Sequence, residues 1–253
     1  MLNQYLLQTQ RLLQNPPAPT SLYATADLTA WINTARGQLA GEAECCKVLG
    51  TISTIATQNS YSFSNINVGV PATTGVQGVI HVSSLHVGVA NGQRWLTPRP
   101  WPWFSLYNLN NPVPQPGPPR EWSQFGQGAA GTGTGSSATG TFVVDPVPDD
   151  VYALTATCVC YPVALVDDTT PEAIPYLWTD AVPFFAACYA LWSAQNNARE
   201  ADAERYFNSY TMFVERARKA SNPSVNRWLY SQSGDPAQAN KMQVQGKPGG
   251  AGG

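Results

Sequence analysis

The side chains in this sequence that could do chemistry include three short acidic groups. These groups are Glu42 with Glu44, Asp149-Asp150 and Asp167-Asp168. A glycosidase places two carboxyl groups on either side of one bond, and nothing in these spacings predicts that two of the groups converge. Asp149-Asp150 follows Pro146-Val-Pro148, which is typical of a turn. We therefore predict no catalytic residue among them.

Two histidines, His81 and His86, lie in a segment with the alternating pattern of a strand. Residues five apart face opposite sides of a regular strand, so we expect no shared site. The sequence has no nucleophile elbow, P-loop or zinc-protease motif, and no dinucleotide-binding motif that leads into a helix. Gly131-Thr-Gly133-Thr-Gly135 lacks the strand and helix that a phosphate-binding loop needs. These observations predict that the protein is not an enzyme.

Five cysteines are present, in the order Cys45-Cys46, Cys158-Val-Cys160 and Cys188. A structural zinc site usually spaces its ligands as Cys-x-x-Cys, so that one turn aims both sulfurs at the ion. Adjacent cysteines point in different directions, and an odd number does not suggest a disulfide framework. We expect buried free thiols that pack as small apolar side chains, no metal site and no cofactor.

Composition narrows the class of protein. The chain has 253 residues, of which 12% are charged, 43% hydrophobic and 11% aromatic. A charged fraction about half the usual 25%, with this many aromatic residues, excludes a disordered chain. A formal net charge of −2 offers no basic excess for nucleic-acid binding. Since no apolar run reaches the ~20 residues of a membrane helix and the N-terminus lacks signal-peptide features, we expect a soluble cytosolic chain with no membrane partner.

Charge is unevenly distributed along the chain. Residues 1–198 carry six Lys/Arg and eleven Asp/Glu, whereas residues 199–253 carry eight and five. A basic end on an acidic body can dock against an acidic partner. A solvated helix followed by a loose tail gives the same pattern, and charge alone favours this second interpretation.

Two helices are predicted near the N-terminus. Apolar residues from Leu2 to Leu13 have helical spacing, which Asn15-Pro16-Pro17 ends. Asp27 has the character of an N-cap. A stripe then begins at Leu28 and predicts a helix to about Leu49, with Gly50 as its stop.

The middle of the chain has the alternation of strands. Val, Ile, Thr and aromatic residues alternate with polar ones in Thr51–Thr57, Tyr61–Phe63, Val79–Ser83, Thr141–Val144 and Tyr152–Tyr161. Trp95–Trp122 is rich in Trp and Pro, and Gly126–Gly140 has the composition of a flexible loop. The aromatic rings of the first segment could fill a core, contact a protein or stack on a sugar.

Helical spacing returns near the C-terminus. Trp178, Val182, Phe185, Tyr189 and Trp192 form one stripe, with Thr179 as a cap and Pro183 in the first turn. Asn196-Asn197 predicts a break before a second helix with apolar positions from Ala203 to Ala217. The remaining residues are polar apart from Trp228-Leu229-Tyr230.

Together these patterns predict an α+β fold, in which a helical bundle carries an inserted all-β, sandwich- or barrel-like domain. The expected units are N-terminal bundle helices in 1–50, the β-domain in 51–165, C-terminal bundle helices in 166–220 and an extended tail in 221–253. The apolar and aromatic content exceeds what such a small bundle and β-domain can easily hide, so we also expect a multimer.

This order of motifs resembles the head-to-tail adaptor (connector) proteins of short-tailed bacteriophages. The resemblance covers residues 25–220. It rests on Leu28-Thr-Ala-Trp31-Ile-Asn33-Thr-Ala35-Arg36-Gly-Gln38, on Ile174–Ala187, and on Asp202–Arg218 with Tyr206, Tyr210, Met212 and Arg216-Ala-Arg218.

The resemblance implies a structural virion protein at the head–tail junction, made in the host bacterial cytoplasm. Such a protein forms a homo-dodecameric ring beneath the portal protein, extends the DNA channel used in DNA ejection and provides the platform for the tail nozzle or tube protein. DNA would be only the channel contents. The alternative is a tail-associated component that binds glycans or cleaves polysaccharides with its Trp-rich β-domain.

The resemblance also implies where partners bind. The C-terminal segment of such adaptors often reaches the portal, and here the tail is basic with one apolar cluster. We therefore expect Arg227, Trp228, Leu229 and Tyr230 to bind the portal protein. We expect the tail contact to involve Trp101, Trp103 and Phe104.

Overall fold

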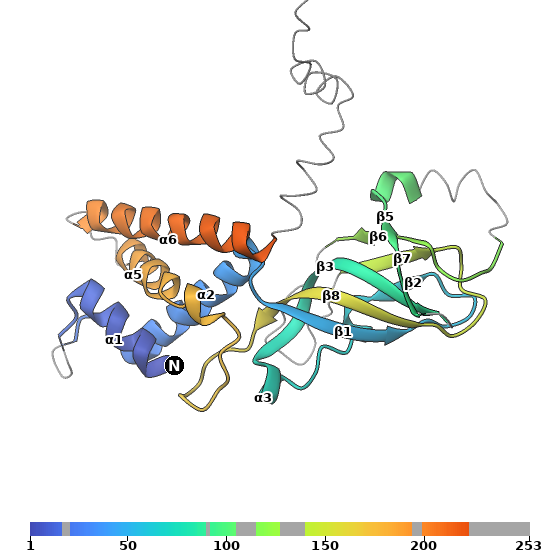
Figure 1. The fold of residues 1–253 in the computed structure, drawn as a ribbon. Helices are drawn as coiled ribbons and strands as arrows, with labels where there is room; N and C mark the ends of the chain where they lie inside the picture. Colours follow the sequence, from blue (N-terminus) through green and yellow to red (C-terminus); the bar gives the residue numbers. More distant parts are fainter. Residues whose placement is uncertain (17–20, 90–91, 105–114, 127–139, 194–198, 223–253) are drawn as a thin grey trace, which may run out of the picture.

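The computed structural model describes residues 1–16, 21–89, 92–104, 115–126, 140–193 and 199–222. Helices gather on one side of the molecule and two small sheets on the other (Figure 1). The fold is α+β, which confirms the predicted class.

Four helices form the bundle: α1 (Leu2–Leu13), α2 (Thr25–Ala43), α5 (Ala181–Ser193) and α6 (Glu200–Ser221). Helices α2 and α5 each pack against the other three helices, and the contacts of α5 are the more extensive. The buried Ala186, Ala187 and Ala190 of α5 lack bulk and let the neighbouring helices approach closely. Pro183 lies in the first turn of α5, as predicted, where its missing amide hydrogen costs little.

The predicted end of the second helix is wrong. Helix α2 ends at Ala43, Glu44 adopts a left-handed conformation, and strand β1 begins at Lys47. Residues from Val48 onward pair with β8 as a strand, whereas the apolar stripe itself ends at Ala43. Gly50 is a packing residue of this strand, since a Cβ there would lie 2.4 Å from a methyl carbon of Ile66.

Two predicted caps also differ from the structure. Ala24 occupies the N-cap position of α2, and Asp27 lies in the first turn, where its charge still favours the helix dipole. Thr179 follows a short 3₁₀ turn, η2 (Tyr176–Trp178), and its hydroxyl donates to the carbonyl of Tyr176. The predicted break at Asn196-Asn197 lies outside the described residues.

The first sheet is antiparallel, with strand order β1-β8-β3-β4. Its strands are β1 (Lys47–Ser53), β8 (Ala153–Pro162), β3 (Val76–Val89) and β4 (Gly92–Trp95). The second sheet has the order β2-β7-β6-β5, in which only the β5–β6 pair is parallel. Its strands are β2 (Ser60–Ser62), β7 (Thr141–Asp145), β6 (Glu121–Phe125) and β5 (Thr97–Pro98). A short helix, α3 (Pro71–Thr74), precedes β3, and the predicted loop 127–139 lies outside the described residues.

The prediction that His81 and His86 face opposite sides of their strand is wrong. They pair with Val159 and Thr155 of β8, which are four residues apart and therefore on one face. The register of β3 shifts between Val82 and Ser84, so the bulge absorbs one residue of the spacing. Their partners on β8 are nevertheless four residues apart, which corresponds to about 13 Å along the strand.

Two hydrophobic cores hold the molecule together. The helical core contains buried side chains from all four helices, including Tyr5, Leu28, Ile32, Leu39, Leu191 and Tyr210. The β core lies between the sheets and includes Phe63, Leu85, Trp122, Phe142 and Leu154. Ala173 packs against both cores, so the segment between β8 and α5 lies where they meet.

Candidate functional site: the joint between the two cores and the sides of the bundle

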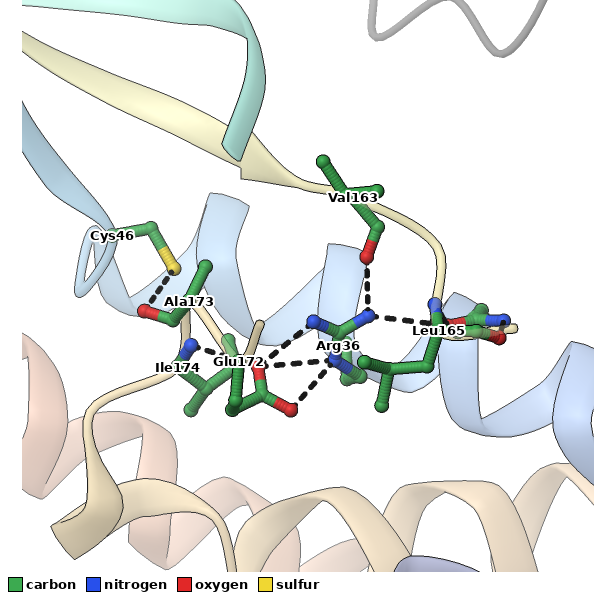
Figure 2. Close-up of polar contacts among 8 residues, drawn as sticks. Arg36, Cys46, Val163, Leu165, Glu172, Ala173 and Ile174 are labelled. Atoms are coloured by element: carbon green, nitrogen blue, oxygen red, sulfur yellow. Dashed lines mark hydrogen bonds and ion pairs between the residues drawn. The ribbon is translucent and has the colours of Figure 1, made fainter. Parts of the chain in front are cut away.

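A buried ion pair lies at the joint, which we define as the contact between α2 and residues 163–174. Nη2 of Arg36 lies 2.8 Å from Oε1 of Glu172, and the two side chains are only 1% and 8% exposed. Nε of Arg36 also donates to both carboxylate oxygens, at 3.2 and 3.1 Å (Figure 2). This fork-to-fork geometry is the strong form of an ion pair.

The remaining donors of Arg36 are also used. Nη1 donates to the carbonyl oxygen of Val163 at 2.6 Å and to the side-chain oxygen of Asn33 at 3.1 Å. Asn33 in turn holds Leu165 through two bonds, one to its amide and one to its carbonyl, at 2.8 and 3.0 Å. Helix α2 therefore fixes the chain segment that leaves β8 and leads to α5.

Close packing completes the joint. A Cβ atom at Gly37 would lie 2.0 Å from the hydroxyl oxygen of Tyr161, so only glycine lets this ring of β8 lie against α2. The Cys46 thiol donates to the carbonyl of Ala173 at 3.5 Å. The two cores are thus connected rigidly by polar and steric contacts.

A second set of contacts, the α6 anchor, consists of Glu44, Lys47 and Asn222. Nζ of Lys47 donates to the carbonyl of Ser221 at 2.8 Å and to the side-chain oxygen of Asn222. Asn222 donates to Glu44 at 2.7 Å, and Nε2 of His81 lies 3.8 Å from that carboxylate. Burial lowers the pKa of Lys47, and burial likewise lowers the pKa of His81 against the opposing effect of Glu44. The last described residue of the chain is therefore held at a fixed point beside β1.

An open groove of about 570 Å³ runs along one side of the bundle, between α1, the start of α5 and α6. Leu12, Pro183, Phe184 and Phe213 supply its apolar lining. Its polar lining residues are Gln8, Arg11 and Asp180. This is a surface that an apolar side chain of a partner could enter.

An aromatic face lies on the other side of α6, toward α2. It consists of Phe185, Tyr189, Trp192, Phe207 and Tyr210, whose neighbouring ring centroids are 4.7 to 6.4 Å apart. Tyr189, Trp192 and Phe207 are 43%, 46% and 40% exposed. Contiguous exposed rings of this kind mark interaction sites. The apolar stripes predicted this surface only as core positions.

The predicted tail-contact residues lie beside β5 and β6. Trp101 packs on Phe125, with ring centroids 4.8 Å apart, and the guanidinium of Arg99 lies 5.0 Å from the ring centroid of Trp103. Phe104 is 1% exposed, so its side chain anchors this segment and offers no surface to a partner. The other predicted set, Arg227 to Tyr230, lies outside the described residues.

Each acidic group named in the sequence has a structural role. Glu42 accepts a hydrogen bond from Tyr210, and Glu44 belongs to the α6 anchor. Asp149 accepts from Tyr152, and Asp150 from the following backbone amide. Asp167 caps a turn through Thr169 and Thr170, while Asp168 accepts from the N-terminal amine and from Asn3.

The cysteines are buried free thiols, as predicted. Burial raises the pKa of Cys158 and Cys160 to about 12 and that of Cys188 to about 11. These three side chains therefore stay protonated and act as apolar packing groups. Within the ranges that the structure describes, no group of three or more His, Cys, Asp or Glu is arranged to hold a metal ion. Over the same ranges, no helix is both long and apolar enough to cross a bilayer.

The joint holds the fold together, and the groove and the aromatic face are two apolar surfaces that a partner could cover. The family model of the SU10 adaptor protein matches residues 6–235, and the chain belongs to this family of phage structural adaptors. The resemblance seen in the sequence is thereby confirmed. A comparison with curated proteins gave no match.

Proposed function

We propose that this chain is a head-to-tail adaptor that forms a ring, expected to be twelve-fold, beneath the portal protein of the phage head. The ring extends the DNA channel and carries the tail nozzle. The observation that carries this proposal is the family match over residues 6–235, on a chain whose two cores are joined rigidly. A subunit with two rigidly joined cores supports the adaptor role, because a connector must hold the head and the tail in a fixed relative position.

In this proposal the helical bundle and the β-domain have different roles. The four helices, which lie within residues 1–43 and 181–221, form the bundle that closes the ring, and the inserted β-domain, whose strands run from Lys47 to Pro162, faces the tail. Trp101 and Trp103 are half-buried on the β-domain and are the proposed nozzle contacts. Aromatic rings that are held in place by neighbours lose little freedom on binding.

The tail 221–253 is the proposed portal tether. Residues 223–253 carry three Lys/Arg, one Asp and the cluster Trp228-Leu229-Tyr230. Burying such rings is worth about 2–3 kcal/mol each, which offsets part of the cost of ordering the segment. The α6 anchor supports this role, because it fixes the point from which an extended segment of up to about 110 Å would start.

Co-sedimentation with portal rings tests the proposal. The full chain should sediment with the rings, whereas a chain ending at Asn222 and the Trp228→Ala variant should remain in the supernatant. The truncation retains the anchor, so circular dichroism should show unchanged helix content. The matched control is Trp95→Ala, because Trp95 is an exposed tryptophan on β4.

Two results would count against the proposal. If the truncated chain binds portal rings as well as the full chain does, the tether assignment is wrong and the bundle makes the contact. If the full chain does not bind portal rings and instead binds host polysaccharide, the protein is a glycan-binding component of the tail.

A further inference from the structure

Two consecutive residues of α5 face the two flanks of α6. Phe184 lies against Tyr206 and Phe213, with ring centroids 6.3 and 6.0 Å apart, on the flank that borders α1. Phe185 lies against Tyr210, with a centroid distance of 4.7 Å, on the flank that borders α2. Helix α6 therefore separates the groove from the aromatic face, and the bundle presents two different apolar sides.

The two sides differ in what they offer a partner. The groove is hollow and lined by apolar side chains, whereas the aromatic face presents the half-exposed rings of Tyr189, Trp192 and Phe207. Side chains of a partner can enter the groove, whereas the aromatic face has exposed rings that can enter a groove on a partner. Neither side is suited to pair with itself.

The charges around the aromatic face are acidic. Glu204 and Glu200 precede Phe207 by one and two turns of α6, so they lie on the same exposed ridge. Glu42 borders the face from α2, where its carboxylate accepts from the Tyr210 hydroxyl at 3.0 Å. In the part of the chain that the structure describes, Glu200 and Glu204 form no ion pair.

The charges around the groove are mainly basic. Arg11 lines it, and exposed Arg216 lies one turn beyond Phe213 on α6. Burial and Asp202 raise the pKa of Tyr206, whereas Arg199 and exposed Arg205 oppose this shift, so these three charges also lie near this side. Asp180 is the acidic member of the lining. The groove side thus carries four arginines against two carboxylates, which are Arg11, Arg199, Arg205 and Arg216 against Asp180 and Asp202.

We infer that the aromatic face of one copy of this chain packs into the groove side of the next copy. Trp192 and Phe207 enter the apolar groove, and Glu200 and Glu204 meet Arg11 and Arg216. Shape and charge are complementary between the two sides and not within either one. This inference rests on the proposed ring and names the surfaces that close it.

The position of the two sides determines the kind of assembly. Because they are different surfaces on opposite flanks of α6, their contact is heterologous and leaves one free side at each end of a growing chain of copies. Such contacts continue until the ring closes. A contact between two identical sides would stop at a dimer.

Mixing two variants of the full chain tests this arrangement. The first variant, Trp192→Glu with Phe207→Glu, blocks the aromatic face. The second, Arg11→Glu with Arg216→Glu, blocks the groove side. Each variant alone should self-associate at least about tenfold more weakly than the wild type in sedimentation velocity, because each loses central contacts of the interface. Val151→Glu is the control, since Val151 is exposed and lies outside the bundle.

The mixture has a distinctive expected result. A 1:1 mixture of the two variants should form dimers that grow no further, because the intact groove of one variant meets the intact aromatic face of the other. Variants that assemble like the wild type, or a mixture that stays monomeric while the wild type assembles, would overturn the inference. Circular dichroism checks that all variants remain folded, since the substituted side chains are at least 40% exposed or lie at exposed positions.

Assembled phage particles provide the second measurement, which decides the case if the free wild type stays monomeric. A photo-crosslinking residue in place of Trp192 should label residues 8–12 or 213–216 of another copy. Labelling of residue 192 itself in the other copy, or of the β-domain, would show the inference to be wrong. Incorporation into particles reports on the adaptor role separately, so a chain that is incorporated but crosslinks elsewhere fails only this inference.

Discussion

Arg36 and Glu172 are 136 residues apart in sequence, yet their side chains form a buried ion pair with an N–O distance of 2.8 Å. The pair connects the helix before the two sheets to the segment after them. Its stabilising effect depends on full satisfaction of both partners, because an isolated buried charge is very costly.

Removing one partner of this pair should therefore destabilise the whole chain. We expect Glu172→Gln to lower the free energy of unfolding by about 3–5 kcal/mol, since Arg36 would stay buried without a counter-charge. Chemical denaturation followed by tryptophan fluorescence measures this change. The control is Asp202→Asn, which breaks the more exposed pair with Arg199 and should cost about 0–1 kcal/mol. Equal effects of the two variants would contradict this account of the joint.

Two glycines of α2 should respond in opposite directions to the same change. Gly37→Ala places a methyl group 2.0 Å from the hydroxyl oxygen of Tyr161 and should destabilise the chain by about 1–3 kcal/mol. Gly41 has open space around it, so Gly41→Ala should stabilise the helix by about 0.5–1 kcal/mol. Thermal unfolding of both variants tests the prediction, which fails if Gly37→Ala is neutral.

The stability of the chain should depend on pH through His81. Burial lowers the pKa of His81 in the folded state below its usual 6.5. The unfolded chain then binds the proton more readily, so the stabilising contribution is present above pH 6.5 and is lost as the pH falls through the folded pKa. His81→Gln should flatten the fall in denaturation midpoint below pH 6.5. If the denaturation midpoint of the variant falls with pH as steeply as that of the wild type, groups other than His81 cause the pH dependence.

Substitution of the paired aspartates should leave the phage infectious. Asp149 and Asp150 bind neighbours in their own turn, so Asp149→Ala and Asp150→Ala should yield normal particles with unchanged plaque counts. Normal particles that have lost infectivity would indicate a catalytic role. The same test applied to Glu42 and Glu44 is less direct, because both support the packing of α6.

The sequence predicted the class of fold because its strongest signals are local. The stripe that begins at Leu28 and the alternation around Tyr61 each depend on the period of a single element, and both correspond to observed elements. The predicted end of α2, with Gly50 as its stop, is wrong because the apolar stripe itself ends at Ala43 and Val48 pairs with Cys158 as a strand residue.

The surfaces of the bundle could not be predicted in the same way. The apolar positions of α5 and α6 predict which residues are apolar, but exposure depends on how many helices surround α5. Trp192 and Tyr189 extend the same stripe as buried Val182, yet no described helix covers them. Ion pairs such as Arg36–Glu172 could not be predicted from the sequence either, because the residues that surround each partner in the sequence give no information about the other partner.

The chain passes from the helical core to the β core at the start of β1 and returns at the end of β8. These two points lie side by side, because Lys47 at the start of β1 pairs with Val159 near the end of β8. An insert whose two ends are neighbours can be lost, enlarged or exchanged in evolution without moving the helices that flank it. The bundle is thus free to retain its contacts while the inserted unit diverges. Under the proposed assignment of the β-domain to the tail contact, exchange of this unit between related phages would join one type of head to a different tail.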